Sequence, residues 1–228
     1  MPKDFRKLDN PAWYALTERQ SSFARGTRSF KRFDPGIVLF AGFDRKAKNV
    51  ADQFDPVIGL QESVFLFDEF PALPANYIIE SEIDCLQMMC KKPIPVPVTE
   101  SIISLDEKNT DEMFTLVSAV FPGYYLPDTR RMGDYKGIFR DGRLVAMAGE
   151  RLRMDGLTEI SAVVTDPAYT GRRYAQQLIF VLNEKNMQSG SVPFLHCGAN
   201  NERAITVYEL LGFEKRRIIP VTKIRRVG

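Results

Sequence analysis

The feature that most constrains the fold of this sequence is an extended apolar run that leads through a short turn straight into a helical pattern. Residues 159–165 form the run and residues 166–173 form the turn. Helical spacing then extends over residues 174–188. A strand that feeds directly into a helix predicts a chain in which helices pack on a sheet.

The start of that helix also suits an anionic ligand. The first N–H groups of a helix have no partner within it, and its dipole is positive at this end, so the turn can hold a pyrophosphate. Gly171 and Ala175 are small enough for phosphates to approach the backbone, and Arg172 and Arg173 add positive charge. A Gly-Arg-Arg turn is also common on ordinary protein surfaces, so this unit alone leaves both interpretations open.

The rest of the second half alternates between strand and helix patterns. Turns at residues 141–142 and 155–156 are Asp-Gly pairs between extended apolar runs, so the flanking strands should pair antiparallel. The expected strands are 102–105, 134–140, 144–153, 158–165, 194–197 and 218–224, and the expected helices are 109–121, 174–188 and 201–211.

The first half carries weaker patterns. Asn10 should cap a helix that has Pro11 at its first position and runs to about Ala24. Residues 91–98 contain three prolines and cannot form a central strand, so we place a boundary there. This predicts two domains, residues 1–97 and residues 98–228. The expected strands of the first domain are 37–40, 63–67, 77–80 and 85–89.

Composition excludes several classes of protein. The net charge of +2 gives no general attraction to nucleic acid. No apolar run approaches the ~20 residues that a membrane-spanning helix needs, and the first residues lack the apolar core of a secretory signal. The three cysteines have no metal-ligand spacing and read as reduced thiols, so we expect a cytoplasmic protein without a metal. His196 is the only histidine, and its apolar surroundings favour a structural role.

Residues 100–220 resemble the GNAT superfamily of N-acetyltransferases. The turn at residues 170–175 is similar to the superfamily's first signature, although Thr170 replaces the usual Arg or Gln and Arg173 replaces a second glycine. Because the loop binds through backbone N–H groups, Arg173 is compatible with binding if its φ stays negative. The second signature is matched by Asn201, Ala204, Tyr208, Leu211, Gly212 and Phe213.

The resemblance implies a GNAT fold, which is a mixed and mostly antiparallel twisted sheet flanked by helices (an α/β, or mixed α+β, class). It also implies a smaller, degenerate GNAT-like half before it, because residues 10–13 and 33–35 loosely resemble the region that precedes one GNAT subgroup. The implied substrate is acetyl-coenzyme A. The implied binding residues are Val163, Val164, Thr165, Thr170, Gly171, Arg172, Arg173, Tyr174, Ala175, Asn201 and Tyr208.

Three residues are candidates for catalysis. Tyr208 matches the family tyrosine that binds the coenzyme sulfur and can protonate the leaving thiolate, although it could simply be a core aromatic. Asn201 could bind the pantetheine or cap its helix. The acceptor ammonium must lose a proton before attack, and Glu159 or Glu150 could remove it, directly or through water. Strand alternation puts Glu159 on the same face as Val163, and the alternative is that either glutamate forms a salt bridge.

The resulting hypothesis is an N-acetyltransferase that moves an acetyl group to a primary amine by direct attack in a ternary complex. Retained Tyr208 favours catalysis, whereas Thr170 and Arg173 leave open a non-catalytic acyl-coenzyme A sensor or a partner-binding relative. The acceptor should be a small-molecule or peptide amine, with no nucleic acid or membrane as partner. The sequence leaves a homodimer open.

Overall fold

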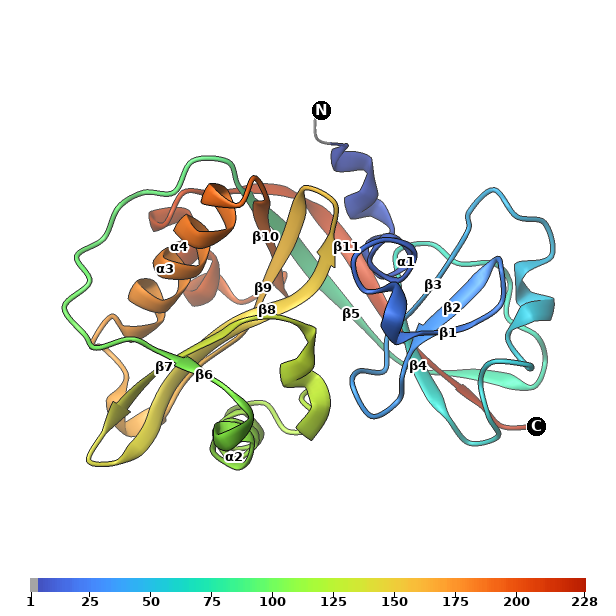
Figure 1. Cartoon of the computed structure of the whole chain (residues 1–228). Helices are drawn as coiled ribbons and strands as arrows, with labels where there is room; N and C mark the ends of the chain where they lie inside the picture. The colour runs from blue at the N-terminus through green and yellow to red at the C-terminus, as the bar shows by residue number, and fades with distance from the viewer. Residues whose placement is uncertain (1–3) are drawn as a thin grey trace.

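The computed structural model describes residues 4–228 and divides into two lobes joined by two long strands (Figure 1). Eight strands form one sheet in the order β4-β11-β5-β10-β9-β8-β7-β6, and β1-β2-β3 form a second, small sheet. The strands are β1 (Ala24–Gly26), β2 (Phe30–Phe33), β3 (Ala41–Phe43), β4 (Ser63–Phe67), β5 (Tyr77–Cys90), β6 (Ile103–Leu105), β7 (Tyr135–Arg140), β8 (Arg143–Met154), β9 (Leu157–Thr165), β10 (Val192–Gly198) and β11 (Phe213–Arg226).

Helices cover both faces of the large sheet. Figure 1 shows α3 and α4 on one face and α2 on the other. The α-helices are α1 (Pro11–Thr17), α2 (Thr110–Val120), α3 (Tyr174–Gln188) and α4 (Glu202–Leu210). Six short 3₁₀ turns connect these elements: η1 (Phe5–Asp9), η2 (Ser21–Phe23), η3 (Val50–Gln53), η4 (Glu107–Asn109), η5 (Pro127–Met132) and η6 (Pro167–Tyr169). The predicted fold class, a mixed and mostly antiparallel sheet flanked by helices, is confirmed.

Most elements of the second half form where the sequence predicts them. Helix α3 spans residues 174–188 as expected, and β7, β8 and β9 pair antiparallel in consecutive hairpins. Asp141 and Gly142 have φ values of 51° and 73°, and two successive positive φ values match the right-handed twist of the strands they join. The chemistry of the turns therefore gave the correct pairing.

The first half differs from its prediction at α1. The helix ends at Thr17, not near Ala24, because Gln20 is buried and bonds to other elements. Its side-chain amide donates to the carbonyls of Met132 and Arg151, and its oxygen accepts from the Arg153 amide. Those bonds hold Gln20 out of the helix. The expected Asn10 cap is also wrong.

Two further corrections concern Asn10 and the strand expected at residues 37–40. The Asn10 side chain donates to the Phe43 carbonyl 2.7 Å away and does not cap α1, although Pro11 does occupy the first turn. Residues 37–40 form no strand: residues 35–37 are a turn, in which the amides of Ile37 and Val38 both donate to the Asp34 carbonyl, and Phe40 makes an isolated bridge to Phe65. Both segments are shaped by tertiary contacts that sequence periodicity does not report.

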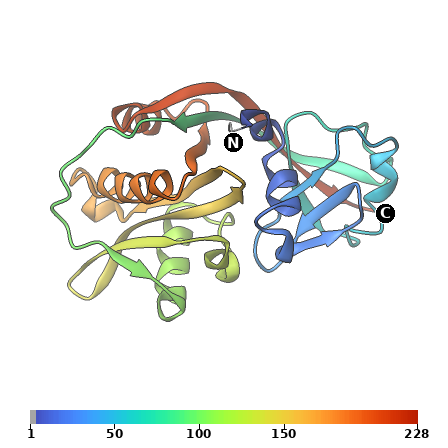
Figure 2. The ribbon, with the colours of Figure 1, turned by 45° about the horizontal axis from the view of Figure 1, so that its top comes forward.

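The long strand β5 joins the two lobes. The sequence predicts separate strands at 77–80 and 85–89, whereas the structure has one strand that pairs with β11 along its whole length. The predicted boundary at residue 97 lies in the extended segment after β5, and β5 itself belongs to the large sheet. The division into residues 1–97 and 98–228 stays a prediction. Figure 2 shows β5 and β11 passing together from one lobe to the other.

Among residues 4–228, no helix has both the length and the apolar composition that crossing a bilayer requires. The same residues contain no cluster of three His, Cys, Asp or Glu side chains placed to hold a metal ion.

Candidate active site

A cleft opens in the large sheet where two neighbouring parallel strands separate. Strands β9 and β10 pair only from Val192 opposite Leu157 to Phe194 opposite Glu159. Beyond that point β10 stays with β5, while β9 stays with β8. From Ile160 onward, one edge of β9 therefore has no neighbouring strand, and its backbone groups on that side can bond a ligand.

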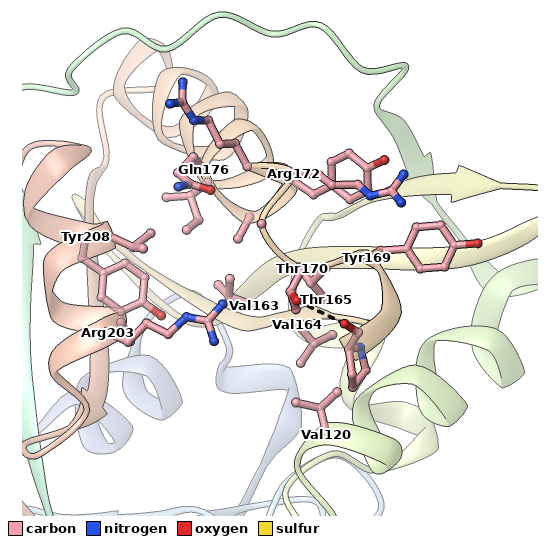
Figure 3. A pocket seen from close by; sticks show the side chains of 18 of the residues that line it. Val120, Val163, Val164, Thr165, Tyr169, Thr170, Arg172, Gln176, Arg203 and Tyr208 are labelled. Carbon is pink, nitrogen blue, oxygen red and sulfur yellow. Dashed lines mark hydrogen bonds between the residues drawn. The ribbon is translucent and has the colours of Figure 1, made fainter.

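The cleft has a volume of about 640 Å³ and combines β9, the turn after it and three helices (Figure 3). Its lining comes from the end of α2, the end of β9, the turn, the start of α3 and one face of α4. The residues are Val120, Phe121, Val163, Val164, Thr165, Pro167, Tyr169, Thr170, Gly171, Arg172, Arg173, Tyr174, Ala175, Gln176, Ile179, Asn201, Arg203, Ala204, Val207 and Tyr208. All eleven residues that the resemblance assigned to coenzyme binding lie in this lining, while their roles in binding stay predictions.

The start of α3 is built to receive an anion. Arg173 occupies the cap position and makes no side-chain cap bond, so the first N–H groups of the helix are not satisfied by a capping side chain. Gly171 has a φ of 79°, a left-handed conformation that glycine adopts without steric cost. The space above Gly171 is open, with no atom within 4 Å of where a Cβ would be. The backbone N–H groups of this turn and the positive end of the helix dipole thus both face the cleft.

The backbone conformation of Arg173 differs from the one that the sequence analysis required. On the sequence alone, a negative φ was the condition for Arg173 to be compatible with binding, whereas its φ is 60° and its ψ is 24°, a left-handed conformation that is unfavourable for a side chain with a Cβ. The turn before α3 needs this geometry to aim its N–H groups, which explains why the resembling signature has glycine at the position. Arg173 therefore combines local strain with an added positive charge.

Replacing Arg173 tests that strain. We expect Arg173→Gly to raise the free energy of unfolding by about 1 kcal/mol relative to Arg173→Ala, because both lose the charge and only glycine relieves the left-handed backbone. Urea denaturation of the two variants measures the difference. Equal stabilities would show that the backbone of this turn is unstrained.

Three arginines of the cleft share a second property. Arg172, Arg173 and Arg203 form none of the ion pairs found among residues 4–228, although most other arginines of the chain are paired. Figure 3 shows the side chain of Arg203 reaching into the cleft from α4, across from the turn that carries Arg172. The Arg172 guanidinium lies 5.1 Å from the ring centre of Tyr169. The cleft thus holds uncompensated positive charge on both sides.

Thr170 does not replace the missing Arg or Gln of the signature. Its hydroxyl donates to the Pro167 carbonyl 3.1 Å away and closes the turn (Figure 3). Arg203 was not predicted from the sequence. A signal was available, because Arg203 lies four residues before Val207 and one before Ala204, on the helix that carries the second signature. Val120 and Phe121 gave no such signal, because α2 reaches the cleft only through tertiary packing.

Tyr208 lies at the β10 side of the cleft. It comes from α4, and its ring packs 5.8 Å from that of Phe213. Burial, with a smaller contribution from the neighbouring Cys197, raises the pKa of the Tyr208 hydroxyl well above its usual range. The group therefore stays protonated and can act as a proton donor. Asn201 caps α4, because its side-chain oxygen accepts from the Ala204 amide at 3.1 Å.

The structure places both candidate glutamates away from the cleft. Glu159 is fully buried and binds Arg151 through two hydrogen bonds of 2.9 and 2.7 Å. His196 contacts the same carboxylate at 2.7 Å. Burial alone would raise the pKa of Glu159, but the adjacent Arg151 guanidinium outweighs it and lowers that pKa to about 2. A carboxylate held this strongly in its ionised form is a poor proton acceptor.

Glu150 is likewise held by buried hydrogen bonds and a salt bridge. It is fully buried, and one of its oxygens accepts from Lys185 at 2.6 Å and from Asn186 at 2.9 Å. Neither Glu150 nor Glu159 lines the cleft. The sequence left two roles open for each glutamate, a catalytic base or a salt-bridge partner. In the structure both glutamates form salt bridges, and this geometry argues against either of them as the base.

A bulge in β9 explains why strand alternation misled the prediction for Glu159. Met147 pairs with Val164 and Gly149 pairs with Ser161, so Ala148 alone faces two residues of β9. Ala162 takes up the extra residue with a φ of 50°. Val163 therefore packs on the α3 side of the sheet and does not share a face with Glu159.

Comparisons with known proteins agree on one family. The model of the FR47-like protein family matches residues 135–221. A crystal structure from Novosphingobium aromaticivorans, of a protein assigned to the GNAT acetyltransferase family, is 34% identical, covers 97% of this chain and 99% of its own, and superposes with a TM-score of 0.89. A GCN5-related N-acetyltransferase from Kribbella flavida shares the fold at 17% identity, with a TM-score of 0.57 and coverage of 98% and 95%. None of the curated proteins matches the sequence. The close likeness across nearly the whole length of both chains shows that this protein belongs to the GNAT family of acetyltransferases.

Proposed function

We propose that this protein transfers the acetyl group of acetyl-coenzyme A to a primary amine by direct attack in a ternary complex. The observation that carries the proposal is the cleft between β9 and α4, which is lined both by three arginines outside the ion pairs of residues 4–228 and by Tyr208. The phosphates of the coenzyme would be held by the N–H groups at the start of α3 and by Arg172, Arg173 and Arg203. The open edge of β9 at Val163 would bond the pantetheine arm.

Groups of the chain, together with water, account for each proton and charge. The amine nitrogen forms a bond to the acetyl carbonyl carbon, the carbon–sulfur bond breaks, and Tyr208 gives its proton to the leaving thiolate. A backbone N–H of β9 near Val163 stabilises the charge that develops on the carbonyl oxygen. Among residues 4–228, no Asp, Glu or His lines the cleft, so water takes both protons that the nitrogen loses: one from the ammonium before attack, and one as the tetrahedral adduct collapses to the amide. Tyr208 recovers a proton from solvent after the thiol leaves.

A thiol-release assay tests this function. Acetyl-coenzyme A is offered with a panel of amines that includes amino-acid amides and short peptides, and free thiol is followed over time. We expect release that depends on both substrates. Tight binding of acetyl-coenzyme A without turnover on any amine would contradict acetyl transfer and favour a non-catalytic sensor of the coenzyme.

The role of the unpaired arginines is separately measurable. We expect Arg203→Gln to raise the Kd for coenzyme A about 10-fold or more at low salt, because a charged hydrogen bond to phosphate is worth about 1.5–3 kcal/mol. The loss should shrink as salt screens the charge. Arg28→Gln is the matched control, since Arg28 is exposed, lies outside the cleft and is also absent from the ion pairs of residues 4–228. Calorimetric titration that finds equal affinities for the two variants would remove Arg203 from the binding site.

A further inference from the structure

One edge of β5 has no neighbouring strand next to the active site. β5 pairs with β11 along its full length, but β10 covers it only from Cys85 to Met89. Residues 78–83 therefore form an open sheet edge that ends at Asp84, and all of residues 78–84 except the half-buried Ile83 are exposed. An edge that is long and uncovered invites another strand.

The register identifies which backbone groups point outward from this edge. Asp84 lies opposite Pro220, which has no N–H, and the Pro220 carbonyl accepts from Asp68 on the far side of β11. The backbone of Asp84 therefore points away from β11, and its carbonyl accepts from the Ala199 amide at 2.9 Å. Antiparallel ladders alternate, so the N–H and the carbonyl of Glu82 also point to the open side. No other strand of residues 4–228 lies there.

The charge on the edge selects a type of partner. Glu82 and Asp84 are exposed and absent from the ion pairs of residues 4–228. Glu82 accepts one hydrogen bond from the Thr222 hydroxyl at 3.0 Å, which leaves its charge uncompensated. Ile79, which is 55% exposed, adds apolar surface farther along. This combination suits an extended peptide that carries basic side chains.

The position of the edge relates it to acetyl transfer. It begins at Asp84, next to the point where Gly198 pairs with Cys85 and β10 ends. Cys197, one residue earlier, packs against the same core cluster as Tyr208. A peptide that ran antiparallel to β5 would start with its amino end beside Asp84 and continue toward Ile79. Its first nitrogen would therefore lie beside the end of β10, the strand that approaches Tyr208 through Cys197.

The cleft's lining supports an α-amine in particular. Among residues 4–228, no carboxylate or imidazole lines it, which favours an acceptor that already contains neutral amine. At pH 7.5 about a third of an α-amine with a pKa near 7.8 is neutral, against about 0.1% of a lysine side chain with a pKa near 10.4. A peptide N-terminus can therefore react although no side chain of the cleft removes its proton.

We propose that the acceptor is the N-terminal α-amine of an extended basic peptide segment, bound as an added antiparallel strand on the open edge of β5 at Glu82 and Asp84. This assignment rests on the proposed acetyl transfer and names its substrate class. Main-chain hydrogen bonds to Glu82 would provide affinity, as in other cases where a peptide adds a strand to a sheet.

The test compares a decapeptide of alternating arginine and valine, which has a free amino end and no lysine, with argininamide. We expect the KM of the decapeptide to be at least 10-fold lower. Glu82→Pro removes the outward N–H and leaves the β11 side of the strand intact, as proline allows at an edge. Glu82→Val keeps that N–H and is the matched control. Relative to Glu82→Val, Glu82→Pro should raise the KM of the decapeptide about 10-fold and leave the values for argininamide and acetyl-coenzyme A unchanged.

Equal KM values for decapeptide and argininamide, or equal effects of the two Glu82 variants, would overturn the proposal while leaving acetyl transfer in place. If no amine is acetylated, acetyl transfer itself fails, and calorimetric binding of the N-blocked decapeptide to the two variants still decides whether the edge binds peptides. If Glu82→Pro does not fold, the wild-type protein is titrated with decapeptides that are N-methylated at single residues. Affinity should then fall at alternate residues only, and a uniform effect would contradict strand addition.

Discussion

Changing Tyr208 to Phe should lower kcat about 100-fold and leave the KM for acetyl-coenzyme A within twofold. The substitution keeps the ring that packs on Phe213 and removes only the hydroxyl. Because burial holds the pKa of this hydroxyl high, it is a protonated donor over the whole working pH range. Loss of a general acid typically costs 10²–10⁴-fold, and we expect about the lower limit because a thiolate is already a moderately stable leaving group.

The control for this variant comes from the same cleft. Tyr169→Phe also removes one hydroxyl but keeps the ring beside Arg172, and it should leave kcat unchanged. Steady-state kinetics of both variants with one amine make the comparison. If Tyr208→Phe turns over as fast as Tyr169→Phe, Tyr208 is a packing residue and the thiolate leaves without an acid.

Replacing Glu159 with Ala should lower the free energy of unfolding by about 3–5 kcal/mol. The change leaves Arg151, whose side chain is only 20% exposed, without its counter-ion. Catalysis by the protein that remains folded should persist at low temperature, because Glu159 does not line the cleft. Glu214→Ala is the control, since that carboxylate forms an exposed ion pair with Lys91 and should change stability by less than about 1 kcal/mol.

The same ion pair predicts an acid limit to stability. The pKa of Glu159 falls to about 2 in the folded state, below its unfolded value near 4.5. Its contribution is therefore complete above pH ~4.5 and is lost as the pH falls toward 2. Urea denaturation between pH 7 and pH 3 should show a steeper loss for the wild type than for Glu159→Ala. Parallel curves would mean that Glu159 is not the ionised partner of Arg151, and loss of kcat without loss of stability in Glu159→Ala would restore it as a catalytic base.

The hydrogen-bond network around Glu159 also includes His196, the only histidine of the sequence. His196 contacts Glu159 through one ring nitrogen and the Gln87 amide through the other, at 2.7 and 2.9 Å. Gln87 in turn donates to the Leu8 carbonyl and accepts from Arg216. These contacts connect the N-terminal segment to the centre of the large sheet. The structural role expected for His196 therefore agrees with its surroundings.

Local chemistry determined much of this protein from the sequence alone. The Asp-Gly turns fixed the hairpins of β7, β8 and β9, because Asp141, Gly142 and Gly156 take positive φ values, which few residue types adopt readily. The loop before α3 and the spacing of residues 201, 204 and 208 on α4 identified the lining of the cleft, since helix termini and helix faces follow from short-range periodicity. The GNAT family itself was recognised from these segments.

Tertiary structure alone decided the rest. The bulge at Ala162 separated Glu159 from Val163, and a one-residue insertion of this kind leaves no trace in the strand pattern. Burial turned Glu159 and Glu150 into ion-pair partners, because a carboxylate without water requires a cation. Arg173 took a left-handed conformation because the turn requires it, although the residue itself does not favour it. The separation of β9 from β10 and the open edge of β5 depend on which strands become neighbours, and that is settled only when distant segments pack together.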